Sequence, residues 1–284
     1  MKKISILIVL ALVLFGCTKS TSALANGNET LVDLNGREVT NQEVYDIFIP
    51  TLHQLVYLKL RDQILDENSP IDDELKAEAA KVLEETKEIL GEEFNTLLTS
   101  YGYANEQEYV DQMIIPQLRS KKLVAKFATD NYDALVEEYV PYQVKLIQFD
   151  TEENAKLAHD QIAAGTITFA DAAKSYGNSY YNGDNLIISG VSSPSTVVMA
   201  AVKEATDKGL LPVINDTAAS KFYAVEVVEK DATVIKDAVI ESFSTNTSMS
   251  QKAYIKIATD NGFQIYDQTV KGYFKESFVG FFAE

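Results

Sequence analysis

Few side chains in this sequence are of the types that carry out catalysis. The chain has one cysteine, Cys17, and two histidines, His53 and His159. Neither histidine has cysteine or carboxylate neighbours at the spacing of metal ligands, so we expect both to be structural or solvated, with no metal and no cofactor. The carboxylate pairs Asp72-Asp73 and Glu92-Glu93 stand at expected helix starts, where negative charge favours the helix dipole. The sequence contains no Gly-x-Ser-x-Gly and no P-loop signature, so hydrolase and nucleotide-binding functions have no support.

Cys17 follows an apolar stretch, Ile4 to Phe15, which itself follows Lys2 and Lys3. The stretch is shorter than the roughly 20 apolar residues that span a bilayer, and it has the pattern of a secretory signal peptide. Leu14-Phe15-Gly16-Cys17 resembles the bacterial lipobox, in which a diacylglycerol is attached to the cysteine and the chain is cut before it. We therefore expect a signal peptide over 1–16, a lipidated Cys17 with a flexible leash over 17–28, and a place on the extracytoplasmic face of the cell membrane. The alternative is an ordinary signal peptide with an unrelated cysteine.

The chain is strongly acidic. It has 25 Lys and Arg against 42 Asp and Glu, and removal of Lys2 and Lys3 with the signal peptide leaves 23 − 42 = −19. Nucleic-acid phosphates demand a basic surface, so a nucleic-acid partner is excluded. The acidity is typical of a soluble surface.

The residues from 29 to 140 predict helices. Two short extended pieces around Asn35-Gly36 precede a capping box from Thr40 to Glu43, and apolar residues then recur at helical spacing up to Leu65. A further helix is expected from Asp72 to Gly91, and its apolar stripe continues to Leu98. A second capping box, Asn105 to Glu108, opens a third long helix.

The pattern changes at Pro141 and changes back after Lys230. A small α/β domain is expected over 141–230, with a loop over 177–193. Its expected strands are Tyr142–Phe149 and Lys221–Val228, and its expected helices are Ala155–Ala164, Phe169–Tyr176 and Thr196–Thr206. Helix then returns over Val234–Ala258, followed by a short strand over Phe263–Tyr266. The predicted fold is α+β: a discontinuous helical domain, 29–140 with 231–284, that carries the α/β domain as an insert.

Three segments carry a resemblance to a known family. They are "LVDLNGREVTNQEVYDIF", "LGEEFNTLLTSYGYANEQEYVDQM" and "DNGFQIYDQTVKGYF". Their order, after a lipobox and around an α/β insert, resembles the PrsA-type extracellular foldases, over nearly the whole chain. These are lipoproteins whose SurA-like chaperone domain contains an inserted parvulin-type peptidyl-prolyl isomerase domain. The resemblance implies that the last segment forms a closing strand that pairs with the opening one.

The insert departs from the parvulin pattern at its catalytic positions. Aligned on Ala155, one family histidine falls on Leu146 and the other on Tyr223, while the Asp/Cys position falls on Ser179. The Met and Phe of the proline pocket fall near Ser193 and Val197. Lowering the X-Pro barrier requires polar groups that bind the twisted amide better than the planar one. The replacements therefore predict a parvulin-like domain whose catalytic centre is lost; the alternative is an active isomerase.

Several tyrosines are candidates for binding unfolded proteins. Tyr101, Tyr103, Tyr109, Tyr132 and Tyr139, with Tyr142, are expected near the junction of the two domains. They line either a client-binding surface or a packed interface. The predicted function is a membrane-anchored chaperone for unfolded or partly folded secreted proteins, and the sequence leaves homodimer formation open. A surface solute-binding lipoprotein is a further alternative.

Overall fold

The computed structural model describes residues 24–282 of the 284-residue chain. The expected signal peptide and Cys17 lie outside the described residues. Contacts divide the chain into two compact units, residues 1–68 with 254–284 and residues 69–253. The predicted limits of the α/β insert, 141 and 230, both lie within the second unit. No described helix combines the length and the hydropathy that crossing a bilayer needs.

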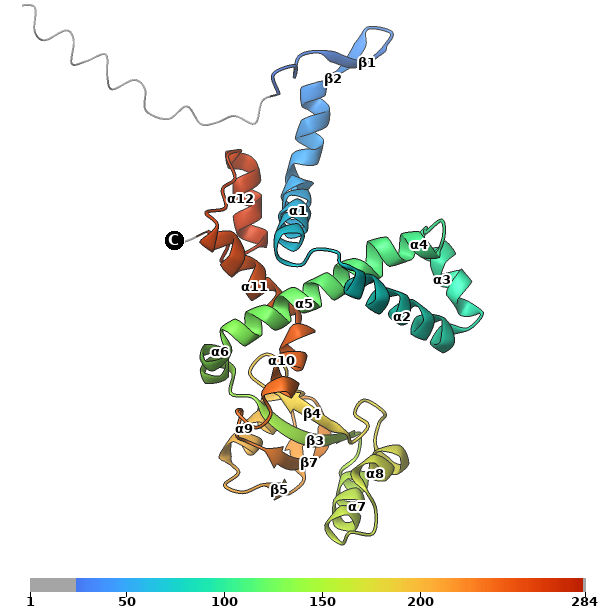
Figure 1. Ribbon diagram of the computed structural model, residues 1–284, viewed down its shortest axis with the longest axis vertical. Coiled ribbons are helices and arrows are strands. Elements are labelled where there is room, and N and C mark those ends of the chain that lie inside the picture. Colours follow the sequence, from blue (N-terminus) through green and yellow to red (C-terminus); the bar gives the residue numbers. More distant parts are fainter. Residues whose placement is uncertain (1–23, 283–284) are drawn as a thin grey trace, which may run out of the picture. The chain divides into compact units, whose positions relative to one another are not determined.

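The first unit contains a two-stranded antiparallel hairpin, as the sequence predicts (Figure 1). Its strands are β1, Thr30–Leu34, and β2, Arg37–Thr40. Asn35 and Gly36 connect them with φ angles of 55° and 79°. Two consecutive positive φ values are what a type I′ turn requires, which explains the Asn-Gly pair.

Residues 24–28, the end of the predicted leash, form a turn against the start of helix α1, Asn41–Asn68. The backbone N–H of Gly27 donates to the Leu24 carbonyl at 3.0 Å, and that of Gln42 donates to the Gly27 carbonyl at 2.9 Å. A Cβ on Gly27 would lie 2.8 Å from Oε1 of Gln42, so a larger residue here would require the Gln42 side chain to move.

Helix α1, Asn41–Asn68, begins at the predicted capping box. The backbone N–H of Thr40 donates to the Glu43 carboxylate at 2.7 Å, and the N–H of Glu43 donates to Thr40 Oγ1 at 3.3 Å. Two N–H groups at the start of the helix are thereby satisfied, which confirms the box.

Aromatic rings join α1 to α12, Gln268–Ser277. Ring centroids are 4.3 Å apart for Tyr57 and Phe278, 5.5 Å for Phe263 and Phe274, and 5.4 Å for Phe274 and Phe281. Phe274 is fully buried at the centre of this cluster. Because truncation of a buried Phe typically costs about 3–5 kcal/mol, the cluster is a principal source of stability for this unit.

The predicted strand over Phe263–Tyr266 is wrong. These residues form no strand, and among the described residues β1 pairs only with β2, so the closing strand implied by the resemblance is also absent. The ring of Phe263 packs in the aromatic cluster instead. The chain then enters α12 directly, with the Asp267 side chain accepting from the backbone N–H groups of Thr269 and Val270.

The second unit begins with a helical arm (Figure 1). Its elements are α2 (Asp73–Leu90), α3 (Glu93–Tyr101), α4 (Glu106–Tyr109), the π-helical turn η1 (Val110–Ile114), α5 (Ile115–Asp130) and α6 (Tyr132–Tyr139). Both predicted helix starts are confirmed, since Asp72 caps α2 and Asn105 caps α4. In η1 the N–H of Ile115 bonds to the carbonyl of Val110, five residues back. Pro116 has no N–H to continue the normal ladder, which accounts for the widened turn.

The arm leads into an antiparallel sheet with helices on both faces (Figure 1). The strands are β3 (Tyr142–Phe149), β4 (Asn185–Ile188), β5 (Gly209–Leu210), β6 (Ile214–Asp216) and β7 (Lys221–Glu229), in the order β4-β3-β7-β5, with β6 also beside β7. Helices α7 (Glu152–Ala163) and α8 (Phe169–Tyr176) pack on one face. Helix α9 (Thr196–Glu204) packs on the other.

The sequence analysis found β3, β7 and the three helices but missed β4, β5 and β6. β4 lies inside the predicted loop 177–193, so that part of the prediction is wrong. These strands are two to four residues long and owe their form to pairing with β3 or β7. A periodicity of two residues cannot be recognised over so few positions.

The predicted helix Val234–Ala258 is two helices, α10 (Lys236–Ser244) and α11 (Thr247–Asp260). Asn246 separates them, because its side-chain oxygen accepts from the N–H groups of Ser248 and Met249 and so caps α11. The fold class is α+β, as predicted: mostly helical with a central antiparallel sheet.

Candidate functional site

The sheet face under α9 carries the positions that the resemblance makes catalytic. Side chains alternate along β3 and β7, so Val144 and Leu146 face α9 together with Tyr223 and Val225. Ile147 and Ala224 face α7 and α8. The antiparallel register places Leu146 opposite Val225 and Tyr223 opposite Gln148. Leu146 and Tyr223 are therefore diagonal neighbours on one face.

Both of these side chains are part of the hydrophobic core. Leu146 is 0% exposed and Tyr223 2% exposed, and Val198 and Val202 of α9 belong to the same cluster. Leu146 has no polar atom in its side chain, so it can neither donate to nor accept from a substrate amide. Leu146 therefore contributes to core packing, and it brings no hydrogen-bonding group to this face of the sheet.

Tyr223 lies near two other polar groups, Tyr181 and Asp216. Burial raises the pKa of the Tyr223 hydroxyl, and the nearby Asp216 and Tyr181 raise it further. Burial also raises the pKa of Tyr181. Both phenols therefore stay protonated at neutral pH and can donate a hydrogen bond. Asp216 is 7% exposed and accepts from the backbone N–H of Ala219 at 3.0 Å.

The sequence analysis missed Tyr181 and Asp216. Tyr181 lies in the segment predicted as a loop, and Asp216 ends β6, which the pattern did not reveal. Sheet pairing between Asp216 and Lys221 sets the Asp216 backbone beside β7, and no local sequence signal encodes that pairing.

Ser179 and Val197 lie away from this cluster. Ser179 is exposed and has a φ of 66° in the turn after α8, and Val197 is 38% exposed on α9. Ser193 is also exposed. Met199 packs against the cluster instead, as does Tyr181. Of the residues that the resemblance selects, only Leu146 and Tyr223 share the α9-facing surface of the sheet.

The turn between α8 and β4 contains Gly183, which lies close to the start of α8. Gly183 has a φ of 80°, and a Cβ there would lie 2.6 Å from the backbone oxygen of Phe169. Asn182 and Asp184 tighten the turn, since the N–H of Asp184 donates to the Asn182 side chain at 3.1 Å. The loop thus needs glycine in order to pass close to α8.

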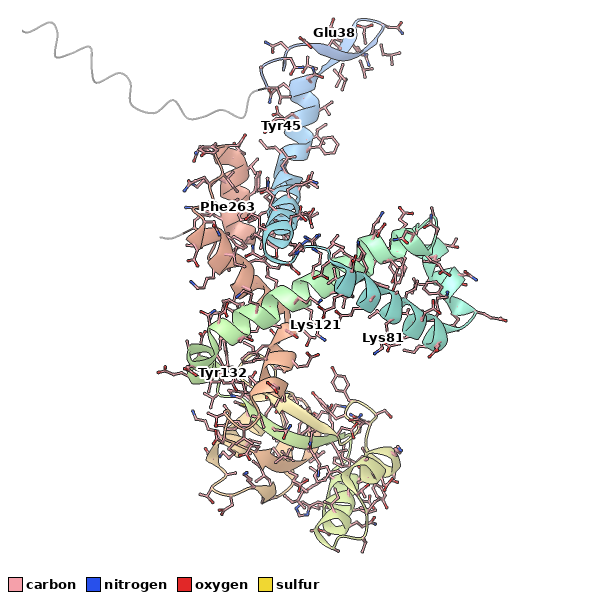
Figure 2. All side chains as sticks on the ribbon, in the orientation of Figure 1. Glu38, Tyr45, Lys81, Lys121, Tyr132 and Phe263 are labelled. Carbon is pink, nitrogen blue, oxygen red and sulfur yellow. The ribbon has the colours of Figure 1, made fainter. Side chains whose placement is uncertain are left out.

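The five candidate tyrosines do not form one cluster. Tyr101, Tyr103 and Tyr109 belong to the α3–α4 end of the arm, whereas Tyr132 and Tyr139 lie on α6, at the other end of α5 (Figures 1 and 2). Tyr103 and Tyr109 are half-buried and pack edge to face at 5.5 Å. Only Tyr101 is widely exposed, at 74%.

Tyr132 and Tyr139 hold helices together. The hydroxyl of Tyr132 donates to the carbonyl of Ala232 at 2.5 Å, and Nζ of Lys236 lies 4.8 Å from its ring centre. The hydroxyl of Tyr139 accepts from Nζ of Lys252 at 3.0 Å. These contacts favour the packing alternative for both residues.

A second apolar face on α1 is the largest feature that the sequence analysis missed. Ile47, Phe48, Leu55 and Leu58 are 72%, 57%, 56% and 41% exposed. At 100° per residue they lie on one side of the helix, nearly opposite the side that holds His53 and Leu60. These residues belong to the apolar pattern that recurs at helical spacing up to Leu65, and that pattern alone did not distinguish a buried side from an exposed one. A helix that is apolar on two sides is the signal that could have separated them.

His53 is buried within the first unit. It is 7% exposed, its Nε2 lies 3.1 Å from Oγ of Ser277, and its ring stacks on Tyr273 at 6.0 Å. Among the described residues, 24–282, no group of three or more His, Cys, Asp or Glu could hold a metal ion.

Charged side chains hold the end of β7 and the two residues that follow it. The Glu229 carboxylate accepts from Nζ of Lys208 and from the backbone N–H groups of Lys230 and Asp231, the latter two at 2.9 and 3.0 Å. The hydrogen bond from Lys208, followed by those from Asp231 and Lys230, lowers the pKa of Glu229 to about 2. Nζ of Lys230 donates to the carbonyls of Val202 and Ala205 at 3.1 and 2.6 Å, which caps the end of α9.

No model of a known protein family matches the sequence, and no curated protein matches it. Solved structures are similar over most of the chain, at low sequence identity. Foldase protein PrsA from Streptococcus pneumoniae is 20% identical, with 87% of this chain and 98% of that chain covered and a TM-score of 0.45. Peptidylprolyl isomerase PrsA from Bacillus cereus is 18% identical, with 89% and 99% covered and a TM-score of 0.42. A SurA-like chaperone of Campylobacter jejuni is 17% identical, with 82% and 95% covered and a TM-score of 0.24.

The low pKa of Glu229 predicts a loss of stability in acid. A lowered folded-state pKa means that the stabilisation is fully present above the ordinary value of 4.5 and is lost as the pH falls through about 2. In Glu229→Gln, the urea midpoint should fall less between about pH 5 and pH 2 than it does in the parent. The exposed Glu153→Gln serves as the control and should follow the parent. Equal acid sensitivity of Glu229→Gln and the parent would contradict the role of this carboxylate.

Proposed function

We propose that this chain is a membrane-anchored extracytoplasmic chaperone that holds unfolded or partly folded secreted proteins on the exposed apolar face of α1. The observation that carries the proposal is that face, formed by Ile47, Phe48, Leu55 and Leu58 on the side of α1 away from α12. A contiguous exposed apolar surface on a soluble unit marks a site for binding another molecule.

The size of this face suits reversible binding of unfolded chains. Each of its four side chains is roughly half exposed or more, so covering each one contributes about 1 kcal/mol. A client that covers all of them gains a few kcal/mol, which corresponds to weak, releasable binding. The four side chains are all apolar, so they select for apolar client residues rather than for a particular client sequence.

The anchor and the insert complete the proposal. Lipid attached at Cys17 would hold the chaperone where secreted chains emerge, since two or more acyl chains give stable membrane attachment. We assign 29–140 with 231–284 to the chaperone domain and 141–230 to a parvulin-like domain that keeps its shape without its isomerase centre. The burial of Leu146 and Tyr223 supports that loss. Homodimer formation stays a prediction.

A second candidate function is prolyl isomerisation. It is favoured by the Tyr181, Tyr223 and Asp216 group, in which two protonated phenols lie beside a buried carboxylate. Phenol hydroxyls can donate to a twisted amide carbonyl, which is the interaction that isomerisation requires. The solute-binding alternative has less support, because residues 24–282 contain one α/β sheet domain rather than repeated lobes.

The apolar face of α1 can be tested by removing two of its side chains. In a chain of residues 17–284, Phe48→Ser with Leu55→Ser should raise the concentration needed to suppress aggregation of a reduced, denatured secreted protein by about tenfold. The matched control is Ile89→Ser with Val234→Ser, which removes two exposed apolar side chains from the second unit. Light scattering measures both. The proposal fails if the parent leaves scattering unchanged at several-fold excess, and the assignment to α1 fails if the two variants behave alike.

The anchor is tested separately by Cys17→Ala in the full chain. Without the thiol no lipid can be attached, so the variant should stay unprocessed or leave the membrane fraction for the soluble one. Processing is followed by mass spectrometry and retention by membrane flotation. Cleaved protein that remains on membranes at the parental level would rule out attachment through Cys17.

The isomerase alternative is decided by exchange spectroscopy on a short X-Pro peptide with residues 17–284. We expect no exchange above the spontaneous rate, because the sheet face has no imidazole and its core positions are filled. Tyr223→Phe provides the matched variant, since it removes one hydroxyl and keeps the ring. Acceleration by the parent that Tyr223→Phe abolishes would establish an isomerase centre built on the phenol.

A further inference from the structure

The β1–β2 hairpin is amphipathic and has one apolar face open. Its register pairs Val32 with Val39 and Leu34 with Arg37 on one face, and Asp33 with Glu38 on the other. Val32, Leu34 and Val39 are 54%, 68% and 38% exposed. We call these three side chains, with Arg37, the hairpin face.

A two-stranded hairpin of this kind is at most marginally stable by itself. It is a two-stranded sheet, and among the described residues no third strand joins it. Two strands without a covered apolar face are at most marginally stable in water. Covering the hairpin face would therefore stabilise the hairpin.

The position of the chain's expected lipid points to what covers it. Six residues lie between Cys17 and Leu24, and the seven Cα-to-Cα steps from one to the other span at most about 25 Å when fully extended. Leu24 is in turn fixed beside the hairpin, because its N–H donates to Oε1 of Gln42 at 2.9 Å. The N–H of Asn41 donates to the Glu29 carbonyl at 3.1 Å, directly before β1. A lipid on Cys17 would thus keep the hairpin within reach of the bilayer surface.

The charges of the hairpin fit a lipid surface on this face only. Arg37 lies at the edge of the hairpin face, and no described carboxylate lies within ion-pair distance of it. Its aliphatic stem can lie along the acyl boundary while its guanidinium meets lipid phosphate. Asp33 and Glu38, which anionic lipid would repel, are on the opposite face and point to water when the hairpin face is down.

We propose that the hairpin face lies on the membrane and fixes how the tethered chaperone is oriented toward it. The proposal rests on the proposed attachment at Cys17. Val32, Leu34 and Val39 enter the headgroup and acyl boundary, and Arg37 binds lipid phosphate. The hairpin is then a second, weaker contact beside the lipid anchor, and it needs the anchor to keep it close.

The composition of the chain allows a direct test. It has no tryptophan and one cysteine, so an introduced tryptophan reports alone, and Cys17 can be coupled to a maleimide lipid. Residues 17–284 are tethered in this way to phosphatidylcholine vesicles with some phosphatidylglycerol and brominated acyl chains. Leu34→Trp reports the hairpin face, Glu38→Trp the opposite face of the same hairpin, and Ile89→Trp a distant exposed site. Figure 2 labels Glu38 on the hairpin.

We expect brominated lipid to quench Leu34→Trp at least twofold more than Glu38→Trp or Ile89→Trp, with a blue-shifted emission. Equal quenching of the three would overturn the proposal. So would a blue shift of Leu34→Trp that grows with protein concentration without vesicles, which indicates a second copy on the face. A blue shift that requires an added unfolded protein would also overturn it, in favour of a client.

The test separates this proposal from the one it rests on. Chemical coupling supplies the tether whether or not cells lipidate Cys17, so the quenching result stands by itself. Mass spectrometry of the protein isolated from membranes reports cellular lipidation independently. Lipidated protein without selective quenching refutes the hairpin contact alone, and selective quenching without cellular lipidation refutes the anchor alone.

Discussion

The antiparallel pairing of β3 with β7 organises residues 69–253. The two strands are separated by about seventy residues of chain, and closing that loop costs conformational entropy that local structure cannot repay. Burial of Val144, Leu146, Tyr223 and Val225 under α9, and of Ile147 and Ala224 under α7 and α8, supplies the compensation. The chain enters the sheet from α6 and leaves it toward α10. These two points are neighbours, because the start of β3 pairs with the end of β7.

The same pairing sets what the α9-facing surface of the sheet can do. Register places Leu146 and Tyr223 together, as two catalytic side chains would need, but it places them inside the packing. Leu146, which is buried and apolar, presents no polar atom to a substrate. The polar groups that remain nearby, Tyr181 and Asp216, come from a loop and a three-residue strand that depend on β7 for their position. The sheet can therefore form whether or not polar groups stand at the positions of Leu146 and Tyr223.

In the first unit, by contrast, large apolar side chains remain exposed. One side of α1 is used up by the aromatic cluster with α12, and the other side keeps four large apolar residues in water. The hairpin likewise keeps one apolar face open. Exposed apolar surface costs free energy, and covering it on a client or a lipid surface returns that free energy. The buried aromatic cluster therefore stabilises the unit, whereas the exposed faces of α1 and of the hairpin remain available for contact with another molecule.

Local sequence determined those features whose cause is local. Thr40 with Glu43, Asn35-Gly36, Asp72 and Asn105 act within a few residues, so the hairpin turn and the helix starts could be predicted correctly. The long alternating strands and most of the amphipathic helices followed from periodicity. Only the tertiary structure decided which apolar stripe is buried, and it left Ile47 and Phe48 in water while it drew Phe263 out of a predicted strand into an aromatic cluster. It also decided that Tyr132 and Tyr139 hydrogen-bond to residues far along the chain. Tyr181 and Asp216 likewise come to lie beside Tyr223 only in the folded structure. These outcomes depend on contacts between residues far apart in the chain, whose energies a local pattern does not contain.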